Sequence, residues 1–93
     1  MPLFMIHALD KPNALETRLA ARPAHLEHLQ SAPGLKLAAP MLDENGDPLG
    51  SLLIVEAQDI THVRDFFDRD PYVHAGLFDR VEIRPIRVSI GAL

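Results

Sequence analysis

The stretch "LKLAAPMLDENGDPLGSLLIVEA", residues 35–57, predicts a β-hairpin and, with it, the class of fold. Its first eight residues predict a strand at the edge of a sheet, because Pro40 cannot donate a hydrogen bond to a central ladder. The turn formers that follow include Asn45 and Gly46, the strongest hairpin signal in the chain. Residues 51–57 are apolar on both faces, which is typical of a central strand.

The segments on either side of this hairpin alternate between strand and helix. Residues 3–9 ("LFMIHAL") predict a second central strand, since they too are apolar on both faces. Helices are expected at about 13–31 and 60–68, and a last strand with one apolar face at 77–86. The order βαββαβ predicts an α+β, ferredoxin-like fold. In this fold two helices cover one face of a four-stranded antiparallel sheet, and the first and third strands are central.

The expected first helix has leucines along one side, which we expect to face the sheet. They are Leu15, Leu19, Leu26 and Leu29, within an arc of roughly 80° at about 3.6 residues per turn. Asn13, followed three positions later by Glu16, resembles a capping box. The leucines stay in phase across Pro23, so the segment is either one kinked helix or two nearly collinear helices.

Composition limits the kind of protein. Ninety-three residues suit one domain, which we expect to span residues 1–93. A net charge of −4, with only two lysines, argues against binding to nucleic acid. The absence of cysteine excludes thiolate metal sites and a cysteine nucleophile. No apolar run approaches the roughly 20 residues that span a membrane, and no signal-peptide pattern occurs, so we expect a cytoplasmic protein.

Two helices leave one face of the expected sheet uncovered. That face carries either Phe4 and Ile6 or Leu3 and Met5, together with half of residues 51–57. Soluble monomers rarely expose an apolar patch of this size. We therefore expect a homodimer in which the two sheets pack face to face.

Arg22 and His25, in "RPAH", lie one helical turn apart at the border of the leucine side, as Arg18 also does. If both side chains face the sheet, they could hold an anion and transfer a proton, since the histidine pKa lies near physiological pH. The pattern alone favours a structural role, with Arg22 lying over apolar surface and His25 bonded to a backbone carbonyl.

The other histidines give weaker signals, and no metal or cofactor is expected. His28 is expected on the more solvated side of the first helix, and the pair His25-x-x-His28 has no third zinc ligand at a suitable spacing. His7 lies on a central strand, opposite Glu56 if the two central strands pair, where a structural role is favoured. His62 is expected at the surface.

Asp70, in "RDPYVHAG", has a local explanation as a helix cap. Pro71 disfavours the helical region for the residue before it, so the second helix ends there. Asp70 can then cap a short helical turn with Pro71 at its first position and Gly76 just past its end. Asp59 or Thr61 is expected to cap the second helix.

Over nearly its full length the chain resembles the YciI-like family, the YCII-related domain. The most specific stretches are "LETRLAARPAHLEHL" at 15–29 and "DPYVHAGLFDRVEIRPI" at 70–86, and the further matches are "HALDKP" at 7–12 and "LGSLLIVEA" at 49–57. The resemblance implies a ferredoxin-like fold that dimerises through its sheets into an α+β barrel. It also implies a pocket centred on a histidine–aspartate pair.

By position in these stretches, the resemblance implies that His25 and Asp70 form the catalytic pair and that Arg22 helps to bind an anionic or phenolic substrate. The residues that it places near the pocket are Tyr72, Ser51 and Asp10. One departure lies in the second strand, where Ala39 precedes Pro40 in place of the glycine common in the family. The methyl group of this alanine could narrow the pocket.

These observations lead us to expect a small dimeric enzyme, with His25 as general acid/base and Asp70 as its orienting partner. The resemblance implies a small anionic or hydroxyaromatic substrate and lyase, isomerase or hydrolase-type chemistry, because the family includes enzymes that eliminate halide from hydroxylated aromatic compounds. The alternative is a non-catalytic module that binds a small ligand and in which Asp70 only caps. Side chains of His25 and Asp70 more than about 4 Å apart would favour the module, since hydrogen bonds span about 2.6–3.2 Å.

Overall fold

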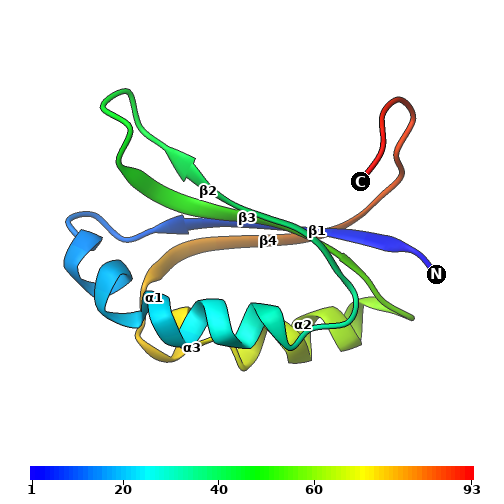
Figure 1. Cartoon of the computed structure of the whole chain (residues 1–93), viewed down its shortest axis with the longest axis horizontal. Helices are drawn as coiled ribbons and strands as arrows, with labels where there is room; N and C mark the ends of the chain where they lie inside the picture. The colour runs from blue at the N-terminus through cyan, green and yellow to red at the C-terminus, as the bar shows by residue number, and fades with distance from the viewer.

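Four strands form one antiparallel sheet, and three helices lie against one of its faces (Figure 1). This computed structural model describes residues 1–93, the whole chain. The elements are β1 (Leu3–Asp10), α1 (Leu15–Gln30), β2 (Leu35–Leu42), β3 (Pro48–Glu56), α2 (Ile60–Asp68), α3 (Pro71–His74) and β4 (Phe78–Ile86). The strand order is β2-β3-β1-β4, so β1 and β3 are central, as predicted. The predicted ferredoxin-like fold is confirmed.

The core lies between the sheet and the helices. Alternate residues of the central strands point toward the helices, and the pairs Ile6–Leu53 and Phe4–Val55 face each other across β1 and β3. Phe67 and Val63 of α2 pack against them. Because side chains alternate along a strand, burial of this set leaves the other set on the opposite face.

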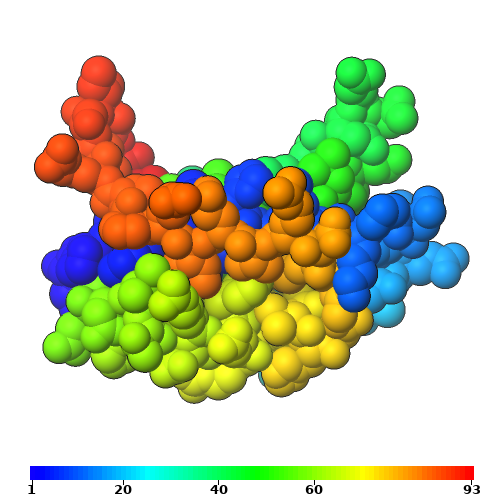
Figure 2. Space-filling view, turned by 180° about the vertical axis from the view of Figure 1, so that it is seen from behind, coloured from blue at the N-terminus to red at the C-terminus, as the bar shows by residue number.

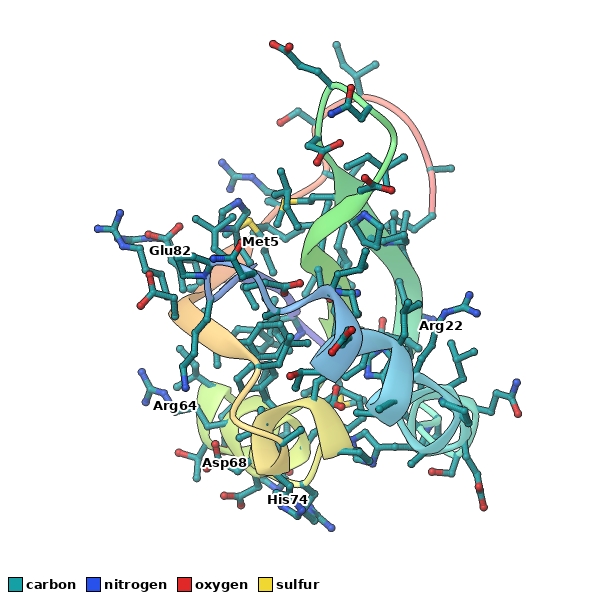
Figure 3. All side chains as sticks on the ribbon, turned by 90° about the vertical axis from the view of Figure 1, so that its left-hand side faces the viewer. Met5, Arg22, Arg64, Asp68, His74 and Glu82 are labelled. Carbon is teal, nitrogen blue, oxygen red and sulfur yellow. The ribbon has the colours of Figure 1, made fainter.

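The opposite face of the sheet is open and largely apolar. Its central residues are Leu3, Met5, His7 and Leu9 of β1 and Leu52 and Ile54 of β3, and all of them are half-buried. The β2–β3 hairpin and the C-terminal residues rise at opposite ends of this face (Figure 1), and Figure 2 shows the hollow between them. Met5 and Glu82 lie on this side of the sheet (Figure 3). The helices therefore cover one face only, as the predicted fold requires.

The prediction that the leucine side of α1 faces the sheet was wrong. Leu15, Leu19 and Leu26 are 39%, 55% and 36% exposed, whereas Arg18 and His25 are buried. Of the four leucines only Leu29 belongs to the core. Polar side chains can occupy this buried side because other elements supply their hydrogen-bond partners, so that burial leaves none of them unpaired.

The start of α1 also differs from the prediction. Asn13 adopts the left-handed conformation, with φ of 58°, and the N-cap residue is Ala14, which makes no side-chain cap. Asparagine tolerates this region better than most residues, which explains its use in the tight connection from β1. Beyond this point α1 is one helix from Leu15 to Gln30 that includes Pro23, so the alternative of two helices is wrong.

Two histidines lie elsewhere than expected. His7 is paired with Leu52 and Glu82 across the sheet and not with Glu56. His28 is half-buried, and its Nε2 lies 3.0 Å from the carbonyl oxygen of Phe66, on whose ring it stacks. The register of β1 and β3 therefore removes the predicted His7–Glu56 contact.

The predicted caps of the later helices are confirmed. Asp59 caps α2 by accepting a hydrogen bond from the backbone N–H of His62. Asp70 caps α3, which has Pro71 at its start, and Gly76 follows with a positive φ of 69°. No helix is long and apolar enough to cross a membrane.

Candidate active site

The side chains of His25 and Asp70 meet between α1 and the start of α3. Nδ1 of His25 lies 2.8 and 2.9 Å from the two carboxylate oxygens of Asp70, and both residues are buried. A carboxylate only accepts hydrogen bonds, so Nδ1 carries the donated proton. Nε2 of His25 makes no hydrogen bond within the chain and is not fully buried, and His25 lines a small cavity.

Asp70 holds two groups at once. Its Oδ1 also accepts a hydrogen bond of 2.9 Å from the backbone N–H of Tyr72, which is the cap of α3. Pro71 fixes the backbone at the first helical position and needs no partner there, since it has no N–H. The cap therefore anchors the carboxylate that faces His25.

Tyr72 lies between His25 and Arg18. The rings of Tyr72 and His25 are stacked, with centroids 3.7 Å apart and an interplanar angle of 12°. The guanidinium carbon of Arg18 lies 4.8 Å from the centroid of the Tyr72 ring. Both side chains of α1 therefore contact the same aromatic ring. Arg18 and His25 are about two helical turns apart, or about 10.5 Å along the helix axis, so side chains that point the same way can both reach Tyr72.

Arg18 is buried together with its counter-ion. Its Nε and Nη2 donate hydrogen bonds of 2.7 and 3.0 Å to the carboxylate of Asp10, and Nη2 donates another of 2.8 Å to Ser51 Oγ. Burial alone would lower the pKa of Arg18, but the hydrogen bonds and negative charge of Asp10 raise it above its usual value. The arginine is therefore a fixed cation with a planar set of donors.

The hydroxyl of Tyr72 stays protonated at neutral pH. Burial raises the pKa of Tyr72 above its usual value, and this outweighs the lowering by the charges of Arg18 and Arg22. The phenol is thus a neutral hydrogen-bond donor beside the histidine.

These groups border one small cavity of about 80 Å³ between α1 and the sheet. Its polar lining residues are Arg18, Arg22, His25, Ser51 and Tyr72, and its apolar lining comes from Leu26, Leu29, Leu53 and residues 38–40 of β2. Arg22 forms the exposed rim and points away from the core (Figure 3). The volume equals two or three waters at about 30 Å³ each, so only a small chemical group fits inside.

Comparison with known proteins identifies the family. The sequence pattern of the YCII-related domain matches residues 2–87. The chain belongs to this family. Protein YciI of Escherichia coli O6:H1 is 39% identical over 95 residues, which cover 91% of this chain and 96% of that protein.

Solved structures with this fold include a dehydrochlorinase. The 5-chloro-2-hydroxyhydroquinone dehydrochlorinase of Burkholderia phenoliruptrix, in complex with 2,5-dihydroxybenzoquinone, is 32% identical with a TM-score of 0.83. The match covers 96% of this chain and 95% of that one. An antibiotic biosynthesis monooxygenase, 14% identical over 97% of this chain and all of its own with a TM-score of 0.61, shares the fold alone.

Most site residues predicted for this YCII-related domain come together. His25, Arg22, Ser51 and Tyr72 line the same cavity, and Asp70 lies directly behind His25. Asp10 lies behind Arg18 and borders a separate, wider recess of about 430 Å³. Ala39 is also in the cavity wall, where its methyl group takes space.

Sequence reasoning missed Arg18 as a site residue. The available signal was its spacing of seven residues from His25, which places the two side chains above one another on a helix. The signal was overlooked because the leucine side of the expected helix predicted that another side of α1 is buried. No group of three or more histidine or acidic side chains that could hold a metal ion is present.

Proposed function

We propose that this protein is a small acid/base enzyme that needs no cofactor and in which Nε2 of His25 exchanges the proton with the substrate. The observation that carries the proposal is the 2.8 Å contact between His25 Nδ1 and Asp70, which leaves Nε2 unpaired on a residue that lines the cavity. A buried carboxylate on Nδ1 holds the imidazole in one tautomer, with Nε2 as the base, and stabilises the imidazolium after proton uptake. General acid–base catalysis of this kind contributes about 10²- to 10⁴-fold.

The substrate we infer is a small hydroxylated ring or a comparable small anion. A similar protein is a dehydrochlorinase that acts on 5-chloro-2-hydroxyhydroquinone. A single ring edge fits the small cavity, with Arg22 at the rim and Tyr72 on the wall. Side chains more than about 4 Å apart would have favoured the alternative, a binding module without catalysis, and the observed contact is shorter.

We further infer that the protein acts as a homodimer that packs its open sheet faces together. The apolar residues of β1 and β3 on that face have no cover within the chain, and such patches mark interaction sites. The chain itself is small enough to gain stability from a partner subunit.

The proposed function is tested by turnover of a substrate from a defined panel. Thermal shift with hydroxyaromatics, lactones and small acids selects ligands, since a ligand at 100 times its Kd stabilises by about 2.7 kcal/mol. Chlorinated hydroxyhydroquinones are then assayed for chloride release. We expect His25→Ala and Asp70→Asn each to reduce turnover at least 100-fold.

The chain offers a matched control in His62→Ala. His62 also contacts an aspartate, Asp59, at 2.7 Å, but the two side chains are 61% and 53% exposed. Replacing the His62 side chain should leave turnover unchanged. Unchanged turnover in both His25→Ala and Asp70→Asn contradicts the proposed mechanism.

A further inference from the structure

The acid/base pair makes no use of Arg18, although this arginine is 4% exposed and lines the cavity. Its hydrogen bonds to Asp10 and Ser51 come from Nε and Nη2 only. Nη1 makes none of these bonds, yet every fully buried polar side-chain atom has a partner. The N–H groups of Nη1 are therefore left to donate to the neighbouring Tyr72 hydroxyl or to a ligand in the cavity that Arg18 lines.

Two hydroxyl groups beside Arg18 are also left free to donate. Ser51 Oγ uses a lone pair to accept from Arg18 Nη2, so its own hydrogen remains available. The Tyr72 phenol is neutral for the reason given above and lies between Arg18 and His25. Both residues are at least 95% buried and line the same cavity as Arg18. Three donors from α1, β3 and α3 thus border one small space.

We propose that Arg18, Ser51 and Tyr72 form an oxyanion subsite that binds the phenolate or enolate oxygen of the substrate within reach of His25. The proposal rests on the proposed function and adds the group that stabilises the charge left when a proton is removed. Such fixed donors are effective because they need no reorganisation during the reaction and act where water is excluded.

The electrostatics favour a weakly charged oxygen over a carboxylate or phosphate. Asp10 balances the charge of Arg18, so the subsite offers oriented N–H and O–H donors without a net positive charge. Asp10 also fixes the guanidinium plane through its two hydrogen bonds. Arg22, by contrast, is exposed on the rim, where solvent screens its charge.

The experiment measures binding of 2,5-dihydroxybenzoquinone, a vinylogous acid whose ionisation changes its absorption spectrum. Arg18→Met alone would leave the buried Asp10 unpaired and risk unfolding, so the informative variant is the double change Asp10→Asn with Arg18→Met. We expect its Kd to rise about 10- to 150-fold, the loss expected for one hydrogen bond to a charged group. The bound quinone should also require a higher pH to ionise than it does on the wild-type protein.

Further variants separate the parts of the subsite. Tyr72→Phe keeps the ring stack and Ser51→Ala keeps the fold, and each should weaken binding several-fold. Arg22→Met is the matched comparison from the same helix and should have a smaller effect than the double variant.

Any of three results would contradict the subsite. The double variant could bind and ionise the quinone as the wild-type protein does, or Arg22→Met could raise the Kd more than the double variant does. The third is that the wild-type protein shows no saturable binding of the quinone. His25→Ala keeps the two proposals distinct. The turnover of His25→Ala tests the acid/base role, and quinone binding by the double variant tests the subsite, so either proposal can fail without the other.

Discussion

Asp70 shows how one side chain joins local and distant structure. Its carboxylate caps α3 through the backbone N–H of Tyr72 and contacts Nδ1 of His25, which is 45 positions away in the chain. The cap could be predicted from the residues next to Asp70 in the sequence, since Pro71 ends the preceding helix and suits the first position of the next. The contact with His25 depends on how α1 lies over the sheet.

Replacing Asp70 in two ways separates these roles. Asn is as good a helix cap as Asp, so Asp70→Asn should keep the cap and lose only the charge. Asp70→Ala should lower the free energy of unfolding by about 2–4 kcal/mol, since it removes a cap worth about 1 kcal/mol and leaves the buried His25 donor unpaired at about 1–3 kcal/mol. Denaturant unfolding of both variants is the measurement. Equal destabilisation would show that the side chain does not cap.

Tyr72 is the only tyrosine and the chain has no tryptophan, so ultraviolet absorption reports this one phenol. Burial raises its pKa, with partial compensation by Arg18 and Arg22, so the folded protein should titrate above the usual value of about 10. In denaturant the midpoint should return to about 10, and Arg22→Met should raise the folded midpoint further. A folded midpoint at or below 10 contradicts the buried environment.

The same shift predicts the pH dependence of stability. The folded state holds the phenol proton more tightly than the unfolded state, so the stabilisation is complete below about pH 10 and is lost as pH rises through the folded pKa. We expect the free energy of unfolding to fall across this alkaline range. Tyr72→Phe should lose less stability over the same range, and an identical fall in both proteins would assign the effect to other groups.

At the scale of elements, the spacing of the leucines in α1 led to a wrong prediction of its buried side. Its leucines are in phase, but the buried side carries Arg18 and His25. Local hydrophobicity cannot show that these polar side chains find hydrogen-bond partners on other elements, namely Asp10, Ser51 and Asp70. The strands were easier to predict, since the apolar residues on both faces of the central strands and the positions of the prolines are visible in the sequence alone.

The continuous α1 makes a prediction about Pro23, which has no N–H to donate to the carbonyl of Leu19. Pro23→Ala should raise the free energy of unfolding by about 2 kcal/mol, because proline costs about 3 kcal/mol inside a helix and restricts the unfolded chain by about 0.4–1 kcal/mol. Pro33→Ala, in the turn after α1, should instead lower stability slightly. Thermal and urea unfolding measure both, and a less stable Pro23→Ala protein would show that the ring is needed for packing.

At the scale of the whole molecule, the open sheet face is the surface through which we propose that two copies of the chain pack. Met5 and Ile54 are neighbours across β1 and β3 at its centre. A charge there would be buried in the proposed dimer, so Ile54→Glu should give a folded monomer by light scattering and circular dichroism. Ala20→Glu, on the exposed side of α1, is the control and should leave the mass unchanged. A wild-type protein of single-chain mass at all concentrations contradicts the dimer.

The sequence by itself determined the order of the elements, the central and edge strands, and the cap Asp70, and it narrowed the cap of α2 to Asp59 or Thr61. These follow from periodicity, proline positions and turn chemistry, all of which act over a few residues. Only the tertiary structure decided which side of α1 is buried and that Arg18 belongs to the site, and it brought into contact the His25 and Asp70 that the family resemblance had paired. The reason is physical: whether a polar side chain can be buried depends on partners that the fold brings from distant parts of the chain.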